Sequence, residues 1–431
     1  MSAQKTHVLI AGAGVFGAST ALHLLRDPEQ KYSVTVIDRA LVLPAPDAAS
    51  TDLNKIVRSS YADPWYTSFA RKSIQAWKSE SIYHGIYHES GVLMSTHVPA
   101  GVSYSDASYQ NDVAIGCRVE NLENQSSFHK YFPGVPSLGP NMVSGYINLD
   151  NGWAYASGGV AATLAEVKRL GGVVKPGCDV ASVVFEGFGR ATGVRLASGE
   201  ILDADTIVIA TGSWTPSRFS ALVDQKLQAT GQCIATIQLS PELAQRYSKT
   251  PVVLDFGTGF YMFPPNEDGI MKIAIHHVGY INPKLADKLG VQNLVSTPRT
   301  VTSHGAAGNA IPKEMLVKLR QGLRDIYPEL GDLPIAGTRL CWYCDTPNTD
   351  WLIDFHPVHS NLLFATGGSG HGYKFLPMLG SLVKDRLEAK LDGPTSARFA
   401  FARSVVESKD PSRLATDRPL LLKEEDLVLG E

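Results

Sequence analysis

A glycine-rich turn near the start of the chain restricts the fold more than any other feature of the sequence. Residues 8–11 are apolar, as in a strand buried on both faces of a parallel sheet, and residues 18–25 carry apolar side chains at helical spacing. Between them lies the motif G-x-G-x-x-G, formed by Gly12, Gly14 and Gly17. Strand, glycine turn and helix in this order predict a Rossmann-like unit that holds a pyrophosphate at the helix N-terminus.

An acidic residue further along supports this prediction. A second apolar strand is predicted over residues 33–37 and ends at Asp38, 21 residues after Gly17. A carboxylate at this place can accept hydrogen bonds from the ribose of an adenosine. The motif does not distinguish NAD from FAD, and the alternative is a glycine turn that only connects a strand to a helix.

Composition excludes several other classes of protein. The chain has 431 residues, enough for two or three domains, and its 39 basic and 42 acidic residues give a net charge of −3, unlike a nucleic-acid-binding protein. No apolar run is long enough to span a membrane, and five thinly spread cysteines favour a reducing compartment. Neither nucleic acid nor a membrane is therefore expected as a partner. The ending Leu-Gly-Glu is not a peroxisomal signal, so a cytoplasmic location is expected.

Later segments predict that the nucleotide-binding unit is assembled from separate parts of the chain. Residues 171–211 predict short strands, the last of which, over residues 206–210, leads to Gly212 as a returning strand of the same sheet would. Residues 226–290 alternate as in an antiparallel sheet. Helices are predicted over residues 66–82 and over residues 315–326, before Pro328.

Several motifs, in this order along the chain, resemble one known family. They are the glycine turn, the segment Asp52-Leu53-Asn54-Lys55-Ile56-Val57-Arg58, the strand Met271-Lys272-Ile273-Ala274-Ile275-His276, the sequence Cys341-Trp342-Tyr343 and the loop Gly368-Ser369-Gly370-His371-Gly372-Tyr373-Lys374. Together they resemble the monomeric sarcosine oxidase family, whose fungal branch contains fructosyl amino acid oxidases (amadoriases) and saccharopine and pipecolate oxidases. The resemblance extends to about residue 390 of the chain.

Pattern and resemblance together imply an α/β fold with two domains. A discontinuous Rossmann-like FAD-binding domain is expected over residues 1–85, 154–225 and 334–431, and an antiparallel-sheet α+β domain over residues 86–153 and 226–333 covers the substrate. The resemblance implies a monomeric FAD-dependent oxidase acting on the secondary amine of an amino acid. A hydride passes to the flavin, the imine hydrolyses in water, and oxygen is reduced to hydrogen peroxide.

Cys341 matches the cysteine through which this family attaches the flavin as a thioether. Such attachment prevents loss of the cofactor and can raise its potential. Cys344 is the alternative carrier of the flavin, because C-W-Y-C is also a C-x-x-C pair. A structural zinc site would need a second pair of ligands and a redox disulfide a thioredoxin-like setting, so no metal is expected.

Lys272 is expected to lie beside the flavin. Strand alternation places it on the same face as Ala274 and His276, although the pattern alone also fits an exposed lysine on an edge strand. In the family this lysine supplies a positive charge that stabilises superoxide as electrons pass to oxygen. Tyr261 matches an active-site tyrosine. His276 stands where amadoriases usually have a glutamate that contacts the sugar, which favours a substrate without a fructosyl group.

Two cations match the carboxylate-binding residues of the family. Arg58 offers a planar fork and Lys374 a point charge, and the alternative for each is an exposed surface charge. The glycines before Lys374 would bring backbone N–H groups close to the flavin, and Lys55 stands where the family has a basic residue near it. The expected cofactor contacts are Gly12, Gly14, Val15, Phe16, Gly17, Asp38, Arg39, Asn54, Lys55, Val180, Gly212, Cys341, Gly368, Gly370, His371, Gly372, Tyr373 and Lys374.

The sequence leaves the identity of the amine open. Saccharopine, pipecolate and N-methyl amino acids are favoured because of His276. A fructosyl amino acid is the alternative substrate. A NAD-dependent dehydrogenase and a non-catalytic flavoprotein are hypotheses from other classes.

Overall fold

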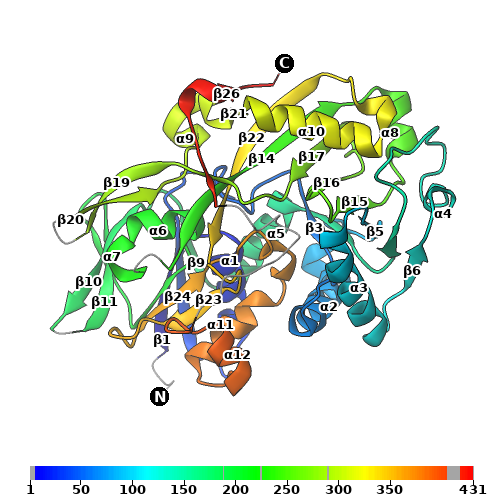
Figure 1. The fold of residues 1–431 in the computed structure, drawn as a ribbon. Helices are drawn as coiled ribbons and strands as arrows, with labels where there is room; N and C mark the ends of the chain where they lie inside the picture. The colour runs from blue at the N-terminus through cyan, green and yellow to red at the C-terminus, as the bar shows by residue number, and fades with distance from the viewer. Residues whose placement is uncertain (1–4, 188, 224–225, 289–290, 405–417, 431) are drawn as a thin grey trace.

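Two large sheets dominate the architecture (Figure 1). The computed structural model describes residues 5–430 except 188, 224–225, 289–290 and 405–417. Strands from the beginning, middle and last third of the chain meet in the first sheet. The second sheet lies above it in Figure 1 and is covered by the long helix α10 (Lys313–Ile326).

The first sheet carries the glycine turn and has six strands in the order β23-β24-β13-β1-β2-β9. These are β1 (Thr6–Ala11), β2 (Tyr32–Ile37), β9 (Val173–Lys175), β13 (Thr206–Ile209), β23 (Leu352–Phe355) and β24 (Leu362–Thr366). Neighbouring strands are parallel except β23 and β24. The predicted α/β fold class, with a discontinuous Rossmann-like sheet, is therefore confirmed.

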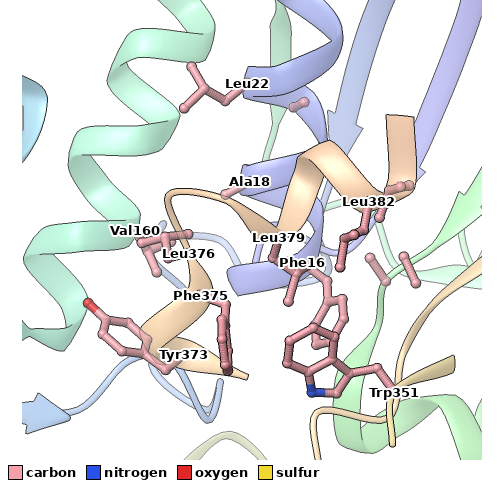
Figure 2. Close-up of a cluster of buried hydrophobic side chains, with 14 of the residues drawn as sticks. Phe16, Ala18, Leu22, Val160, Trp351, Tyr373, Phe375, Leu376, Leu379 and Leu382 are labelled. Atoms are coloured by element: carbon pink, nitrogen blue, oxygen red, sulfur yellow. The ribbon is translucent and has the colours of Figure 1, made fainter. Parts of the chain in front are cut away.

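Alternate side chains of this sheet enter two separate cores. Val8 and Ile10 of β1 pack against helices, whereas Leu9 and Ala11 pack on the opposite face. The helices are α1 (Val15–Leu25), α2 (Pro64–Ser79), α5 (Ala156–Arg169) and α11 (Leu379–Leu387), and the opposite layer contains β10 (Val180–Glu186), β11 (Arg190–Leu196) and β12 (Ile201–Asp203). Figure 2 shows the helical core, where Ala18 and Leu22 of α1 lie between α5 and α11. Burial on both faces explains why residues 8–11 of β1 are all apolar.

The second sheet is built largely from antiparallel pairs. Its order is β25-β18-β14-β17-β16-β15-β5-β7-β6, and β22 pairs with β14 as a branch. The strands are β5 (Val92–Ser95), β6 (Val119–Leu122), β7 (Gly145–Asn148), β14 (Gln228–Gln238), β15 (Val252–Asp255), β16 (Phe260–Met262), β17 (Ile270–Ile275), β18 (Tyr280–Ile281), β22 (Ile335–Asp345) and β25 (Leu420–Leu421). Among the strand pairs of this sheet that the structure describes, only β5–β15 and β18–β25 are parallel. The apolar stripe of α10, including Met315, Leu319 and Leu323, covers one face.

The remaining elements connect or extend these layers. They include β3 (Asn54–Val57), β4 (Tyr87–His88) and β8 (Gly152–Tyr155), which form a small sheet, and the helices α3 (Pro99–Ala114), α4 (Gln125–His129), α6 (Thr215–Arg218), α7 (Ser220–Val223), α8 (Pro241–Tyr247), α9 (Val301–His304) and α12 (Gly393–Arg398). Two short pairs are β19 (Pro283–Lys288) with β20 (Val291–Ser296) and β21 (Ile311–Pro312) with β26 (Leu427–Val428). The domain boundaries stay a prediction; β22, at the start of the third expected FAD segment, pairs with β14 of the second sheet.

Candidate active site

A cavity of about 350 Å³ opens beside the glycine turn. It lies at the carboxyl ends of β1, β2 and β13, where ligands bind in open parallel sheets. The predicted nucleotide contacts that line it are Gly12, Gly14, Val15, Phe16, Asp38, Arg39, Val180 and Gly212. The fold thus brings together in one cavity residues that are separated by up to 200 positions in the sequence, from Gly12 to Gly212.

The glycines of the turn serve different purposes. Gly12 has a φ of +109°, and a Cβ there would lie 2.3 Å from the carbonyl oxygen of Ala210. A Cβ on Gly17 would lie 1.8 Å from the carbonyl oxygen of Gly12, so this glycine packs beneath the turn. A Cβ on Gly14 would meet only Ser50 Oγ, at 3.5 Å. Gly12 and Gly17 are therefore needed for the turn itself, and Gly14 leaves the cavity side open.

This difference makes a testable prediction. We expect Gly12→Ala to destabilise the FAD-free chain by about 2–4 kcal/mol, because the new Cβ meets rigid backbone at a positive φ. Gly14→Ala is the matched control, which should leave the stability of the FAD-free chain nearly unchanged and weaken only FAD binding. Urea unfolding and FAD titration of the apoprotein measure both quantities, and equal stability losses would contradict this assignment.

Asp38 and Arg39 are held in fixed positions at the end of β2. The two oxygens of the Asp38 carboxylate accept hydrogen bonds from the backbone N–H groups of Ala13, at 2.8 Å, and Ala40, at 2.9 Å. Each oxygen has a further lone pair for a ligand. The Arg39 guanidinium lies 4.2 Å from the centroid of the Trp214 ring and binds Asp47 at 2.8 Å, so it forms a wall of the cavity.

Lys272 of β17 lies at the centre of a second cluster, the lysine cluster, which it forms with Asp52 and Lys55. Its side chain is 0% exposed and β17 is an interior strand, so the alternative of an exposed edge lysine is wrong. Its Nζ donates to Asp52 Oδ2 and to the carbonyl oxygen of Asn54, both at 2.6 Å. Lys55 Nζ binds the same Asp52 oxygen at 2.9 Å. One carboxylate therefore holds two ammonium groups.

The charges of this cluster follow from its burial. Burial raises the pKa of Asp52, but Lys272, Lys55 and Arg339 outweigh this and lower it below its ordinary value. Burial lowers the pKa of Lys272 to about 8, against the opposing effect of Asp52 and with a contribution from Lys55. The pKa of Lys55 is raised, since Asp52 outweighs burial. The cluster therefore carries a net positive charge at neutral pH.

The two cysteines of C-W-Y-C lie in different surroundings. Cys341 packs with Tyr343, Ala274 and Tyr261 on the site side of the second sheet, and its Sγ lies 3.7 Å from Lys55 Nζ. Cys344 lies in the core of the first sheet, where Thr366 Oγ1 contacts its sulfur at 3.5 Å. Burial raises the pKa of the Cys344 thiol to about 12. Only Cys341 borders the lysine cluster.

Arg58 and Lys374 are buried, 8% and 6% exposed, so neither is a surface charge. Both lie against the ring of Tyr61, with the Arg58 guanidinium 4.6 Å and Lys374 Nζ 5.2 Å from its centroid. The Tyr61 hydroxyl accepts a hydrogen bond from Lys374 Nζ at 2.7 Å. Phe256 flanks Arg58 at 5.8 Å. Aromatic rings therefore hold two basic side chains close together away from solvent.

The glycine-rich loop before Lys374 packs closely against its neighbours. A Cβ on Gly368 or Gly372 would lie 3.2 or 3.3 Å from the Phe16 ring, and one on Gly370 would lie 2.4 Å from the Tyr343 ring and 2.9 Å from that of His276. The Tyr373 side chain points into the helical core, where its hydroxyl donates to backbone carbonyls of Tyr155 and Ala156 (Figure 2). Only the backbone of Tyr373 is therefore available to a cofactor.

Sequence reasoning assigned no role to Asp52, Tyr61 and Tyr343, which organise these clusters. Asp52 and Tyr61 lie three residues from Lys55 and Arg58, respectively, and Tyr343 shares a face of β22 with Cys341. Tyr343 is hydrogen-bonded to the predicted Tyr261. A polar residue three positions from a predicted cation is the sequence signal that marks Asp52 and Tyr61.

Unsatisfied polar atoms at the site indicate a missing binding partner. Within the described part of the chain, both side-chain polar atoms of Asn54 and Nη1 of Arg58 are buried and have no hydrogen-bond partner. Buried polar groups in proteins are almost always paired. Together with the cavity left open by Gly14, they fit a bound dinucleotide and an anionic substrate. No cluster of three or more metal-ligating side chains occurs among the residues described.

The chain matches the family "FAD dependent oxidoreductase" over residues 7–386, and it belongs to that family. It is 26% identical to the L-saccharopine oxidase of Schizosaccharomyces pombe, over 94% of this chain and 98% of that protein. It is 29% identical to an amino acid oxidase of Aspergillus flavus, over 89% and 92%, and 23% identical to human peroxisomal sarcosine oxidase, over 89% and 93%.

Solved structures of related oxidases resemble this chain over nearly its whole length. A fructosyl peptide oxidase from E. terrenum superposes with a TM-score of 0.87 at 25% identity, covering 98% of this chain and 97% of that one. The fructosamine oxidase Amadoriase II from Aspergillus fumigatus superposes with a TM-score of 0.83 at 27% identity, covering 99% and 97%. The predicted resemblance and the FAD-dependent enzyme class are thus confirmed, and FAD is favoured over NAD.

Proposed function

We propose that this chain is an FAD-dependent oxidase of the secondary amine of an amino acid. The observation that carries the proposal is the buried pair of basic side chains, Arg58 and Lys374, with Arg58 Nη1 unpaired. A carboxylate placed between them would satisfy that atom by a charge-assisted hydrogen bond. The names of the relatives, which include saccharopine, sarcosine and fructosyl peptide oxidases, support the same class of substrate.

The cavity beside the glycine turn fits the adenosine end of FAD, and the lysine cluster fits its flavin end. The glycine turn and Asp38 would hold the pyrophosphate and ribose, and Asn54, Lys55 and Cys341 would contact the ring system. FAD, when bound, supplies the acceptor for the two electrons and the hydrogen removed from the carbon beside the amine. Arg58 and Lys374 orient the substrate by its carboxylate, so that positioning contributes much of the rate.

Lys272 is proposed to assist the passage of electrons to oxygen. It is a buried cation kept in place by Asp52 and the Asn54 carbonyl oxygen, and a fixed positive charge in a water-excluded site stabilises a developing anion strongly. Hydrogen peroxide is then the second product, and the imine leaves to be hydrolysed. Tyr261 and His276 lie near this site, since Tyr261 is hydrogen-bonded to Tyr343 and the His276 ring lies close to Gly370.

Monomeric state and cytoplasmic location stay predictions. In the described part of the chain, no helix is long and apolar enough to cross a membrane.

Cys341 is proposed to carry the flavin through a thioether. We expect Cys341→Ala to bind FAD that is released by acid precipitation, whereas the wild type stays yellow, because among the five cysteines, all of which the structure describes, Cys341 is the one beside Lys55. Cys344→Ala is the matched control and should keep the covalent flavin. Mass spectrometry of the denatured chain measures the adduct. An adduct on Cys344, or none on the wild type, would refute this assignment.

A fructosyl amino acid oxidase is the second candidate, since the structural relatives include fructosyl peptide oxidases. His276 argues against it, because a histidine does not reproduce the charge of the glutamate usual in amadoriases. A peroxide-coupled screen decides between them. It compares saccharopine, pipecolate and N-methyl amino acids with fructosyl-valine and fructosyl-lysine. Peroxide from none of these substrates would overturn the proposed function.

A further inference from the structure

The hydrogen bonds around Lys374 fix the direction of its amino group. Its backbone carbonyl accepts from Ser73 Oγ at 2.7 Å and Trp77 Nε1 at 2.8 Å, which anchors the main chain independently of the side chain. Its Nζ donates to the Tyr61 hydroxyl at 2.7 Å and to the carbonyl oxygen of His371 at 2.9 Å. Both acceptors are electrically neutral.

The partners of Tyr61 explain why its oxygen acts as an acceptor. His371 Nε2 lies 3.0 Å from the carbonyl oxygen of Thr349, which can only accept, so Nε2 carries the proton. In the neutral ring Nδ1 then accepts from the Tyr61 hydroxyl, 3.2 Å away. The hydroxyl proton of Tyr61 is thereby directed to His371, and its oxygen presents lone pairs to Lys374.

The number of N–H bonds on Nζ differs between the two protonation states of Lys374, the neutral amine and the ammonium ion. A neutral amine has two N–H bonds and one lone pair, and the two neutral acceptors use both N–H bonds. The lone pair takes the remaining tetrahedral direction. Lys272 differs, because a carboxylate oxygen lies 2.6 Å from its Nζ. Among the described residues Lys374 has no carboxylate partner, and its charged neighbour is Arg58. Burial and Arg58 lower the pKa of Lys374 well below its ordinary value.

We propose that Lys374 is the base that removes the proton from the ammonium group of the bound amino acid, and that it then binds the carboxylate as the ammonium ion so formed. This inference rests on the proposed function. An N–H bond of the substrate breaks and its electron pair stays on the substrate nitrogen, while a bond forms between Lys374 Nζ and the proton. The substrate carboxylate supplies the negative charge that lets the site hold a second cation beside Arg58. The neutral amine is the oxidisable form, since its lone pair stabilises positive charge at the adjacent carbon.

The other titratable groups around Lys374 are not available to accept the proton from the substrate ammonium group. They are Arg58 after β3, Tyr61, His371 in its own loop and, through Tyr66 of α2, Asp350. Arg58 is cationic at every relevant pH. Tyr61 and His371 already use their facing atoms to orient Lys374, and Asp350 accepts from Tyr66 at 2.9 Å.

Proton uptake on ligand binding provides the first test. The probes are methoxyacetate and tetrahydropyran-2-carboxylate, in which an ether oxygen replaces the amine and no proton can be donated. Weakly buffered holoenzyme at pH 8 with an indicator dye should take up about one proton per bound carboxylate. Lys374→Met should take up none. Binding that is seen in the flavin spectrum without proton uptake by the wild type would overturn the proposal.

The pH dependence of anaerobic reduction provides the second test. Lys374→Arg keeps a cation for the carboxylate but cannot accept a proton. Its reduction rate should rise about tenfold per pH unit up to the pKa of the substrate amine, whereas the wild-type rate is nearly flat over this range. Identical profiles would overturn the proposal. If no secondary amino acid is oxidised, the proposed function fails, but the proton-uptake test still decides the state of Lys374.

Discussion

Lys272→Met is expected to slow the reaction of the reduced enzyme with oxygen by about 10²–10³-fold, because one fixed charge is removed from a water-excluded site. Reduction by the substrate under anaerobic conditions should change by less than about tenfold, since Lys272 does not belong to the pair of cations proposed for the carboxylate. Stopped-flow measurements of the two half-reactions separate the effects. Equal slowing of both would refute the role of Lys272 in oxygen activation.

The fold should tolerate this substitution, because Asp52 keeps Lys55 as a partner at 2.9 Å. The pH dependence is an independent check. With a pKa lowered by burial to about 8, Lys272 is protonated below that pH and loses its charge above it. The oxygen reaction should therefore be fastest below about pH 8 and decline as the pH rises. In Lys272→Met this decline should disappear.

Arg58→Met is expected to lower kcat/KM for an amino acid substrate by about 10²–10³-fold, as for loss of one partner of a buried charge pair. The effect should fall on the carboxylate specifically. In the wild type, a substrate amine without the carboxylate should react poorly. In Arg58→Met, removal of the carboxylate should cause little further loss, and the resulting double-substitution cycle measures the coupling between arginine and carboxylate.

The bound FAD must be counted in each preparation, so that loss of cofactor is not mistaken for loss of substrate binding. Arg58→Lys is the conservative variant. It keeps the charge but not the planar fork, and we expect it to recover only part of kcat/KM. Equal activity of Arg58→Met and wild type on the carboxylate substrate would show that the anion binds elsewhere.

The sequence predicted what depends on local pattern. The strand, turn and helix around Gly12 and the helix α10 are each determined by apolar spacing within a few residues, and both were found as predicted. The fold class could be predicted because the apolar strand at residues 206–210, which leads to Gly212, is typical of a strand that returns to the parallel sheet, where it pairs with β1. The FAD-dependent class of enzyme followed from several motifs together, since none was specific alone.

Pairings across long sequence separations could not be predicted. Asp52 and Lys272 are separated by 220 residues, and their contact depends on the Lys272 side chain of β17 reaching the segment Asp52–Asn54 in three dimensions. Alternation along β22 places Cys341 and Cys344 on opposite faces, but which face meets Lys55 depends on how the sheets pack together. The partnership of Tyr61 with His371 has the same origin, because their separation is 310 residues.

The order of strands in the first sheet has a consequence for biosynthesis. β1 leaves the ribosome first, yet its neighbour β13 ends at Ile209 and the next strand, β24, ends at Thr366. The glycine turn is therefore synthesised long before the residues that pack against it. These are Ala210, whose carbonyl lies against Gly12, and the loop with Gly368 and Gly372, which lies against Phe16. Such non-local assembly folds slowly. Loading of the cofactor should therefore be a late event, completed only after nearly the whole polypeptide has been translated.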